Sequence, residues 1–583
     1  MSATGHISRA GSRLRLCALV SAIGVALVTV GCHDNGTGRP PTVKPESVHV
    51  ESPRPENAGP ADPLFRDVAE SAGLRYVWSI PGTRPLNILQ TIGNGCAFLD
   101  YDHDGNLDIL LVGLHPALYR GDGKGHFTEV THDTGLDKLQ GHFLGCAVGD
   151  YDNDGYDDIC LTAYQGGALL HNEAGRGFRP LPLQAQPWGT SAAFVETVPG
   201  SGRLDLIVAN YARFTHDSAI PQLCEQKSLQ GASRLTSCAP RQYTPLKAVM
   251  FRNRGEGRFG PPVPLTMVTG RGLGVAACDF DSSGRQGVAF ANDETQGDLL
   301  QNQTAGTFVN VGTVSSTAYD RDGNVHGGMG VDWGDSDNDG RFDLLVTTFQ
   351  NESKCLYHNE GGGLFTEISS SIGLGAANPN VSFGCKFFDY DNDGWLDIAI
   401  ANGHVQDNIA EFDAGVVYRQ TLQLFRSQGA GHDRPLTFEE VSGPAGPDFA
   451  RKIVGRGLAI GDYDNDGRVD LLVVDSEGKP LLLHNEVKTT SHWLQLRLIG
   501  AKSNRDGYGA VVTAEVGGRR LTRLCHADGS YMSSSDPRVH FGLGAAERLE
   551  ALTIRWPSGQ TEHLNSIPID RCVTIREGKG ILP

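Results

Sequence analysis

The stretch G-D-Y-D-N-D-G-R-V-D-L-L-V-V, residues 461–474, decides how this chain folds. Its pattern D-x-D-x-D-G-x-x-D, followed by an aliphatic segment, occurs five times, with first aspartates at Asp100, Asp150, Asp335, Asp389 and Asp462. A glycine stands five residues before each first aspartate, at Gly95, Gly145, Gly330, Gly384 and Gly457. The recurrence of both markers predicts a repeat protein built from short strands.

Two further copies have lost most of their acidic residues. In one, Thr197, Pro199 and Ser201 occupy the aspartate positions, and in the other Ser283 and Gly287 do. We predict that neither copy binds a metal well. The seven copies start at residues 100, 150, 197, 279, 335, 389 and 462. Their mean period of about 60 residues exceeds the ~40–50 of a typical propeller blade because of insertions.

A second element alternates with the acidic repeats. Seven strand-like segments begin at Phe65, Phe127, Phe178, Phe259, Phe308, Phe365 and Phe438. Each unit is thus a small sheet that must stack on its neighbours. The array closes with L-L-L-H-N-E at 481–486, so we expect the last sheet to combine strands from both ends and to close the ring. The prediction is an all-β chain whose residues 63–487 form a closed seven-bladed β-propeller, with an open solenoid as the alternative.

The acidic loops predict calcium sites. Four carboxylates within nine residues need a counter-charge, and the glycine at position 6 permits the chain to wrap around one point. Oxygen ligands in this number suit Ca²⁺ better than Zn²⁺ or Mg²⁺. An EF-hand is excluded because its Glu position holds Leu111, Leu161, Val346, Ile400 or Val473. The alternative interpretation is a set of plain Asp-Gly β-turns.

These repeats resemble FG-GAP (VCBS) repeats, the blades of the integrin α-subunit head, over residues 63–487. The resemblance implies about five structural Ca²⁺ ions in loops on one face. Carried over, the carboxylate ligands are Asp100, Asp102, Asp104, Asp108, Asp150, Asp152, Asp154, Asp158, Asp335, Asp337, Asp339, Asp343, Asp389, Asp391, Asp393, Asp397, Asp462, Asp464, Asp466 and Asp470. The backbone carbonyl ligands would come from Asn106, Tyr156, Arg341, Trp395 and Arg468.

The N-terminal residues 1–32 predict export. Arginines precede the apolar run 17–30, which is too short to span ~30 Å of hydrocarbon and is typical of a signal peptide. The run ends in T-V-G-C, which resembles a bacterial lipobox with Cys32 as the acylated residue. Residues 33–62 are a proline-rich linker. We expect a lipoprotein anchored only by its lipid and facing the periplasm or the cell surface; a secreted protein is the alternative.

Charge and motif content restrict the function. The formal net charge of −18 argues against nucleic acid as a partner. The sequence has no HExxH, GxSxG or CxxC motif and no phosphate-binding loop, so no catalytic or organic-cofactor site is predicted. The leading hypothesis is a calcium-stabilised binding or adhesion scaffold for an extracytoplasmic protein or glycan. The alternative is a Ca²⁺-dependent polysaccharide lyase or hydrolase; a plugged channel would favour the scaffold.

Two insertions, 211–250 and 403–450, interrupt the repeat, and loops that project from a rigid ring often carry a ligand surface. Within the first, Cys224 and Cys238 are expected to form a disulfide in an oxidising compartment, with two free thiols as the alternative.

The C-terminal part, residues 488–583, predicts a small antiparallel β-sandwich. Its segments N-R-D-G-Y-G-A (504–510), G-S-Y-M-S-S (529–534), F-G-L-G (541–544) and W-P-S-G (556–559) resemble the ASPIC/UnbV domain. In that family the domain follows FG-GAP repeats, as in cartilage acidic protein and its bacterial relatives. Cys525 and Cys572 are candidates for a disulfide across this domain.

Overall fold

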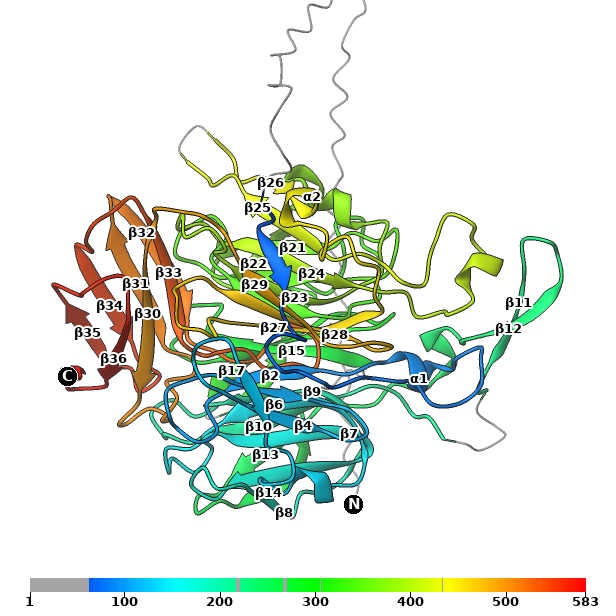
Figure 1. Cartoon of the computed structure of the whole chain (residues 1–583), viewed down its shortest axis with the longest axis horizontal. Coiled ribbons are helices and arrows are strands. Elements are labelled where there is room, and N and C mark those ends of the chain that lie inside the picture. The colour runs from blue at the N-terminus through cyan, green and yellow to red at the C-terminus, as the bar shows by residue number, and fades with distance from the viewer. Residues whose placement is uncertain (1–61, 216–220, 266–269, 305, 432–433) are drawn as a thin grey trace, which may run out of the picture. The chain divides into compact units, whose positions relative to one another are not determined.

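The computed structural model describes residues 62–215, 221–265, 270–304, 306–431 and 434–583. The predicted signal peptide, with Cys32, and all but the last residue of the linker lie outside the described residues. Among the described residues, no helix combines the length and the apolar character needed to cross a membrane. The all-β prediction is confirmed, because the described elements are mainly short antiparallel strands (Figure 1).

In the described residues between 65 and 485, five sheets have four strands each. One holds β2 (Cys96–Leu99), β3 (Asp108–Leu111), β4 (Ala117–Gly121) and β5 (Phe127–Glu129). The next holds β15 (Gly272–Cys278), β16 (Gly287–Asn292), β17 (Asp298–Thr304) and β18 (Thr307–Asn310). A third holds β19 (Val331–Gly334), β20 (Asp343–Val346), β21 (Cys355–Gly361) and β22 (Leu364–Glu367). The fourth holds β23 (Ser382–Phe388), β24 (Asp397–Asn402), β25 (Gln423–Ser427) and β26 (Phe438–Glu440).

The fifth four-stranded sheet joins the two ends of the repeat region. It holds β27 (Gly455–Gly461), β28 (Asp470–Asp475), β29 (Leu481–Asn485) and β1 (Phe65–Asp67). Strand β1 pairs antiparallel with β29, with Phe65 opposite Asn485. The prediction that the last sheet combines strands from both ends is therefore confirmed, by two paired strands that lie 420 residues apart in the chain.

A larger sheet of seven strands covers two sequence repeats. It holds β6 (His142–Gly149), β7 (Asp158–Asn172), β8 (Phe178–Leu181), β9 (Gln186–Val195), β10 (Asp205–Asn210), β13 (Val249–Asn253) and β14 (Phe259–Pro264). The long β7 pairs with both β6 and β9, which makes the two units continuous. A separate hairpin is formed by β11 (Cys224–Lys227) and β12 (Ser233–Thr236). The short helices are α1 (Ile88–Thr91), α2 (Ser442–Ala445), and 3-10 turns at Leu136–Lys138, Pro240–Gln242, Ser369–Ser371, Leu374–Ala377 and Ile409–Glu411.

The first strands of the repeat units lie against one another in a cyclic order. Strand β2 contacts β6, and β6 contacts β9. The order continues from β9 through β15, β19 and β23 to β27, and β27 contacts β2. Each of these strands is almost fully buried, so the sheets bury their faces on neighbouring sheets. The marker glycine permits this close approach. A Cβ at Gly330, for example, would overlap the backbone carbonyl oxygen of Phe383 on the neighbouring sheet.

Every acidic loop is the hairpin between the first and second strand of its unit. In the last unit Gly461 is opposite Asp470, and Leu99 is opposite Asp108 in the first. The glycine at position 6 has φ between 86° and 98° in all five intact loops. That left-handed conformation suits glycine and produces the turn. The loop sequence therefore determines where each hairpin reverses.

The C-terminal region forms two four-stranded sheets around one hydrophobic core (left in Figure 1). One holds β30 (His492–Ile499), β33 (Val539–Gly544), β36 (Cys572–Arg576) and β37 (Gly580–Ile581). The other holds β31 (Val511–Val516), β32 (Arg519–Leu524), β34 (Ala551–Arg555) and β35 (Thr561–Leu564). The expectation of a purely antiparallel sandwich is wrong in one respect, since β30 and β36 pair in parallel. The core of these sheets is continuous with β9, β10 and β13.

Candidate functional site

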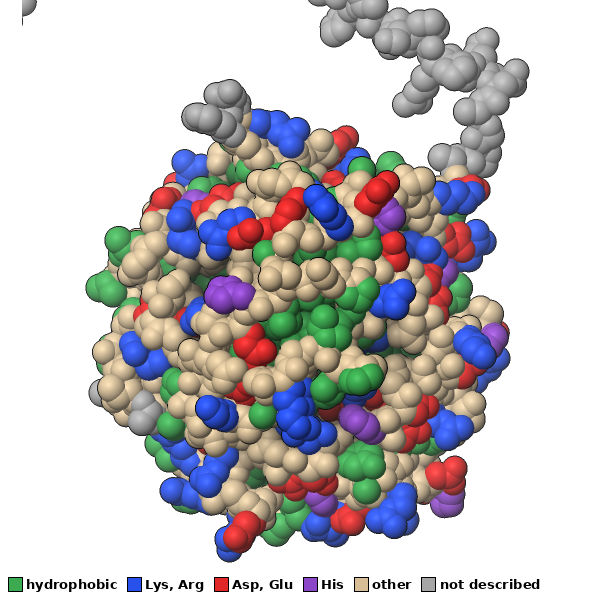
Figure 2. Space-filling model, turned by 90° about the vertical axis from the view of Figure 1, so that its left-hand side faces the viewer, with side chains coloured by type: hydrophobic (Ala, Val, Ile, Leu, Met, Phe, Trp, Pro, Cys, Tyr) green, Lys and Arg blue, Asp and Glu red, His purple; other side chains and the backbone are tan. Residues whose placement is uncertain are grey.

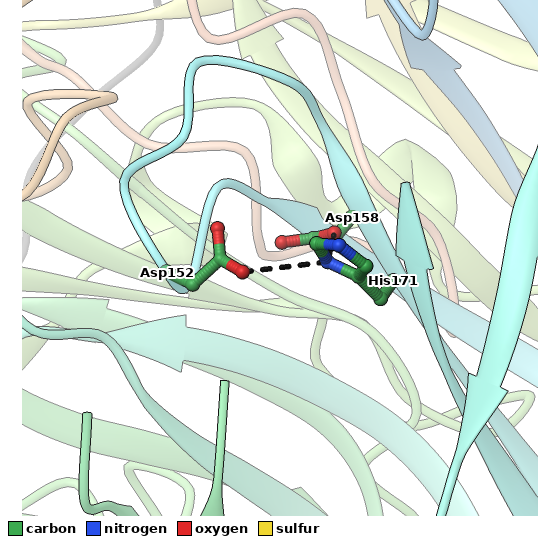
Figure 3. Close-up of side chains that lie close together, drawn as sticks. All are labelled: Asp152, Asp158 and His171. Atoms are coloured by element: carbon green, nitrogen blue, oxygen red, sulfur yellow. Dashed lines mark ion pairs between the residues drawn. The ribbon is translucent and has the colours of Figure 1, made fainter. Parts of the chain in front are cut away.

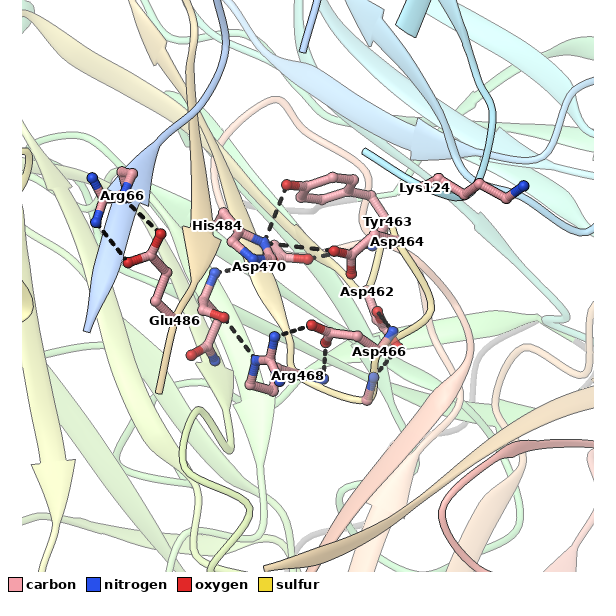
Figure 4. A network of polar contacts seen from close by, with 12 residues as sticks. Arg66, Lys124, Asp462, Tyr463, Asp464, Asp466, Arg468, Asp470, His484 and Glu486 are labelled. Atoms are coloured by element: carbon pink, nitrogen blue, oxygen red, sulfur yellow. Dashed lines mark hydrogen bonds and ion pairs between the residues drawn. The ribbon is translucent and has the colours of Figure 1, made fainter. Parts of the chain in front are cut away.

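The acidic loop 462–470 illustrates how the predicted ligands are held (Figure 4). The carboxylate of Asp462 accepts hydrogen bonds from the backbone N–H groups of Asp466 and Gly467, both at 3.0 Å. Asp470, at the start of β28, accepts one from the Asn485 N–H at 2.8 Å. The first and last aspartates thus tie the loop to itself and to the third strand. The same bonds occur around Asp150, Asp335 and Asp389, and in part around Asp100.

The loops bring several predicted carboxylates together. One ligand atom from each of Asp100, Asp102 and Asp108 lies within 4.8 Å of the others, and the same holds for Asp150, Asp152 and Asp154. Other groups combine two aspartates with a histidine that the sequence argument did not consider: Asp152, Asp158 and His171 (Figure 3); Asp337, Asp339 and His358; Asp464, Asp470 and His484.

Several carboxylate oxygens in these loops are buried with no hydrogen-bond donor. They are Oδ1 of Asp100, Asp102, Asp391 and Asp464, of which three belong to the third loop position. Buried polar atoms are normally paired, so an unpaired carboxylate oxygen at the same position in three loops requires a proton or a cation. Hard oxygen donors arranged in this way fit Ca²⁺. The residues present therefore suit the cation that the loop pattern implies.

The raised pKa values of the loop carboxyl groups also fit a bound cation. Burial raises the pKa of the position-9 carboxyl group of Asp108 to about 9 and that of Asp470 to about 8. Burial, with a further contribution from the charges of Asp393 and Asp391, raises the pKa of Asp389 to about 8. A divalent cation within reach would favour the ionised forms and offset this cost.

The histidines next to the loops occupy one repeat position. His171 is one residue from the end of β7 and His484 is one residue from the end of β29. Each has Nδ1 near two carboxylates: 3.3 Å from Asp152 and 3.4 Å from Asp158 for His171, and 3.8 Å from Asp464 and 3.3 Å from Asp470 for His484. In another unit Arg426 lies 2.8 Å from Asp391. The sequence signal was available, because the triplet H-N-E occurs at 171–173, 358–360 and 484–486.

In the two decayed loops, arginines face the remaining acids. Asp205 is 3.2 Å from the guanidinium of Arg252, which also donates to the Thr197 hydroxyl. Asp279 is 2.6 Å from Arg555 of the C-terminal region. Where the repeat lacks ligands, a fixed side-chain cation supplies the positive charge.

The C-terminal sheets dock on the loops. Arg497 on β30 donates to Asp100 at 3.1 Å, and Arg538 donates to the backbone oxygen of Asp462 at 2.7 Å. Asp506 accepts from the backbone N–H of Asp150 at 2.8 Å. Figure 2, which views this side, shows acidic and basic side chains interspersed over the surface. Much of the loop acidity is therefore covered by the chain itself.

The central segment, residues 527–536, leaves the C-terminal sheets and enters the ring of first strands. It bonds to each of β2, β6, β9, β15, β19, β23 and β27: Ser534 N to Cys96 O (3.0 Å), Cys146 N to Met532 O (3.0 Å), Met532 N to Ser191 Oγ (2.8 Å), Gly529 N to Val275 O (3.2 Å), Ser530 N to Val331 O (2.6 Å), Lys386 Nζ to Asp528 O (3.2 Å) and Asp536 N to Ile460 O (3.0 Å). Tyr531 and Met532 are fully buried. The axis of the described repeat region is thus filled at this level by the chain's own residues.

The two insertions meet on the opposite side of the sheets (right in Figure 1). Cys224 and Cys238, the pair expected from the sequence, form a disulfide with Cα atoms 5.0 Å apart. The hairpin contacts the second insertion, where Arg234 lies 3.1 Å from Glu411. The second expected pairing is wrong, because Cys525 and Cys572 are free thiols. Cys525 is buried and Cys572 is exposed on β36.

Comparisons with known proteins agree with these features. Residues 100–161 match the model of the FG-GAP-like repeat, and residues 500–582 match that of ASPIC and UnbV. The chain is 26% identical to cartilage acidic protein 1 of Xenopus tropicalis over 383 residues, covering 64% of this chain and 52% of that protein. For the mouse protein the values are 26% over 396 residues, 65% and 54%. The resemblance stated from the sequence is confirmed, although the chain spans about half the length of these relatives.

Solved structures show more distant similarity. An Agrocybe aegerita lectin that recognises non-reducing terminal N-acetylglucosamine is 15% identical, with 61% of this chain and 84% of that chain covered and a TM-score of 0.38. A Bacillus licheniformis rhamnogalacturonan lyase is 11% identical, with 71% and 76% covered and a TM-score of 0.33. Scores this low do not establish a shared fold.

Proposed function

We propose that this chain, which carries FG-GAP-like repeats and an ASPIC/UnbV domain, is a calcium-stabilised binding scaffold that acts outside the cytoplasm. In this proposal residues 63–487 form seven blades of a closed β-propeller. The cyclic contacts of the first strands and the β1–β29 pairing support closure. The seven-stranded sheet would then be two blades that share the long β7.

Five Ca²⁺ ions would lie in the intact loops. The ligands would be the carboxylates at positions 1, 3, 5 and 9, with the position-7 carbonyl. The unpaired buried oxygens of Asp102, Asp391 and Asp464 support this assignment, as does the burial of the position-9 aspartates. When bound, the cation supplies charge that the loop lacks. The chain's own residues hold the strand reversals in place.

The observation that carries the scaffold proposal is the filled axis. A lyase or hydrolase working through the channel would need space for substrate there, and the central segment takes that space with hydrogen bonds to seven strands. The exported, lipid-anchored form remains part of the proposal on the strength of residues 1–32 alone. A protein or glycan partner would then meet the side formed by the two insertions.

Calcium removal tests the proposal. The mature chain, starting at Cys32, is expected to melt at a markedly lower temperature in EGTA, because binding that favours the folded state adds about 3–4 kcal/mol per well-saturated site. Calcium should restore the melting temperature and Mg²⁺ should not. Metal analysis should find about five Ca²⁺ per chain, the number of intact loops. An unchanged melting temperature after chelation would contradict the calcium scaffold. Glycan-array and pull-down assays with and without Ca²⁺ then search for the partner.

A further inference from the structure

A cavity of about 460 Å³ lies where the two insertions meet. Its walls come from α1, from the disulfide-linked segment at Cys224 and Cys238, and from Val405 and Gln406 of the second insertion. Helix α1 and the β11–β12 hairpin lie on the side of the repeat sheets away from the C-terminal sheets (Figure 1). Ligand pockets commonly have volumes of roughly 300–1,000 Å³. The cavity is therefore large enough for a small organic molecule.

The floor of the cavity is apolar and closed. Ile88, Leu273, Met329 and Phe383 line it and belong to one buried cluster. That cluster includes Tyr531 of the central segment, whose ring lies 4.9 Å from the ring of Phe383. The floor of the pocket therefore packs against the central segment that fills the axis.

Two carboxylate groups in the cavity wall lie close to the same glycine, Gly327. Oδ1 of Asp293 and Oε2 of Glu352 would lie 3.1 Å and 3.6 Å from a Cβ placed on Gly327, and all three residues line the cavity. The Asp293 side chain is only 5% exposed. Its other oxygen accepts a hydrogen bond from the Tyr211 hydroxyl at 2.5 Å. Gly327 itself lies next to both carboxylates, and its N–H donates to Oε2 of Glu352 at 2.8 Å.

Neither carboxylate has an ion-pair partner among the described residues. Arg271 and Lys354 lie nearby, but they donate to backbone oxygens, of Asp293 at 3.0 Å and of Phe349 at 2.7 Å. Glu294, on the same wall, is by contrast paired with Arg241 at 3.7 Å. Burial raises the pKa of Asp293 to about 7. Arg271 and Lys354 do act on these two carboxylates through their charge. The cavity is nevertheless lined by four acidic residues, Glu225, Asp293, Glu294 and Glu352, and by one basic residue, Arg241, so acidic groups are in excess there.

We propose that this pocket binds an organic cation, with a primary ammonium group on the acidic wall formed by Asp293 and Glu352 and an apolar body that covers Met329 and Phe383. An ammonium group donates three hydrogen bonds, and those to carboxylates are roughly twice as strong as neutral ones. The apolar body gains from leaving water. The inference rests on the proposed function only in taking this side as the recognition surface. It requires no calcium.

The test compares phenethylammonium with the neutral 2-phenylethanol and the anionic 3-phenylpropionate. Binding to the mature full-length chain is measured by calorimetry at about pH 8 in calcium, where Asp293 is ionised. The ammonium compound is expected to bind about tenfold or more tightly than the alcohol, the gain of one charge-assisted hydrogen bond. A lysine peptide and its Nε-acetylated form, run in parallel, distinguish a protein side chain from a small amine as the source.

Asp293→Asn and Glu352→Gln should each reduce the preference for the ammonium compound and leave the affinity for the alcohol unchanged. Glu515→Gln, at an exposed position on β31, is the matched control and should keep the full preference. Equal affinities for the three compounds in the unmodified chain, or a stronger response to a neutral oligosaccharide than to the amines, would overturn the inference. An EGTA melt on the same sample separates the two proposals: a lowered melting temperature without ammonium preference removes the pocket and leaves the scaffold.

Discussion

At the scale of single residues, the aspartate at position 3 of the acidic loop is the most informative. Its Oδ1 is buried and unpaired in the loops of Asp102, Asp391 and Asp464, whereas in the 462–470 loop the first and last aspartates accept hydrogen bonds from backbone N–H groups. Because buried polar atoms are normally paired, the position-3 carboxylate is the best place to test for cation binding.

Asp464→Asn is therefore expected to remove one calcium ion from the chain and to lower its stability by about 3 kcal/mol in calcium-saturated buffer. The reason is that an amide oxygen is a weaker ligand than a carboxylate and brings no charge. Metal analysis and chemical denaturation check this. The matched control is Asp281→Asn, in a decayed loop where Gln301 already donates to that side chain. It should leave the calcium content unchanged, and a loss of calcium there would contradict the loop assignment.

The repeat pattern of the sequence predicts most of the candidate calcium ligands, but it does not predict the charged groups that lie beside them. Period and spacing identified the aspartate quartets because local sequence alone builds the hairpin. His171 lies near the far end of β7, the long strand that begins with Asp158, and His484 lies on β29, so only the folded sheet brings them to the loops. The buried Arg555–Asp279 pair joins residues 276 apart, and sequence spacing has no signal for it.

At the scale of elements, the central segment holds the first strands together. In the sequence this segment stands out only because G-S-Y-M-S-S (529–534) resembles part of the ASPIC/UnbV domain. Small residues are needed because seven strands approach this segment closely. Gly95 shows the constraint, since a Cβ there would overlap the backbone oxygen of Met532.

Gly95→Ala should therefore destabilise the chain by more than about 3 kcal/mol, because the new methyl group collides with backbone that cannot rotate away. The free energy of unfolding from urea titration checks this. Gly375→Ala is the control, as a Cβ at that position meets nothing within 4 Å. Equal stability of the two variants would show that the central segment does not fit against β2 as described.

At the scale of the whole molecule, the C-terminal sheets and the repeat sheets share structure. One buried cluster contains Leu206 and Phe251 of the repeat region together with Leu496 and Trp556 of the C-terminal region. The sequence predicts a domain boundary at residue 488, where the repeat stops. The interpenetration could not be predicted, since both parts were assigned cores of their own.

A chain ending at residue 487 should accordingly lose its single cooperative thermal transition, because the ring of first strands would lose its internal hydrogen bonds. Calorimetry of the full and shortened chains checks this. As a control, a protease site placed at the exposed residues 488–490 should give two fragments that stay together on gel filtration. Fragments that separate and each melt cooperatively would contradict a shared core.

The origin of the central segment near the chain's end sets an order of assembly. Strand β1 can pair only when β29 is present, and the axis can be filled only when residues 527–536 are present. A chain truncated before residue 527 would lack the segment that fills this axis.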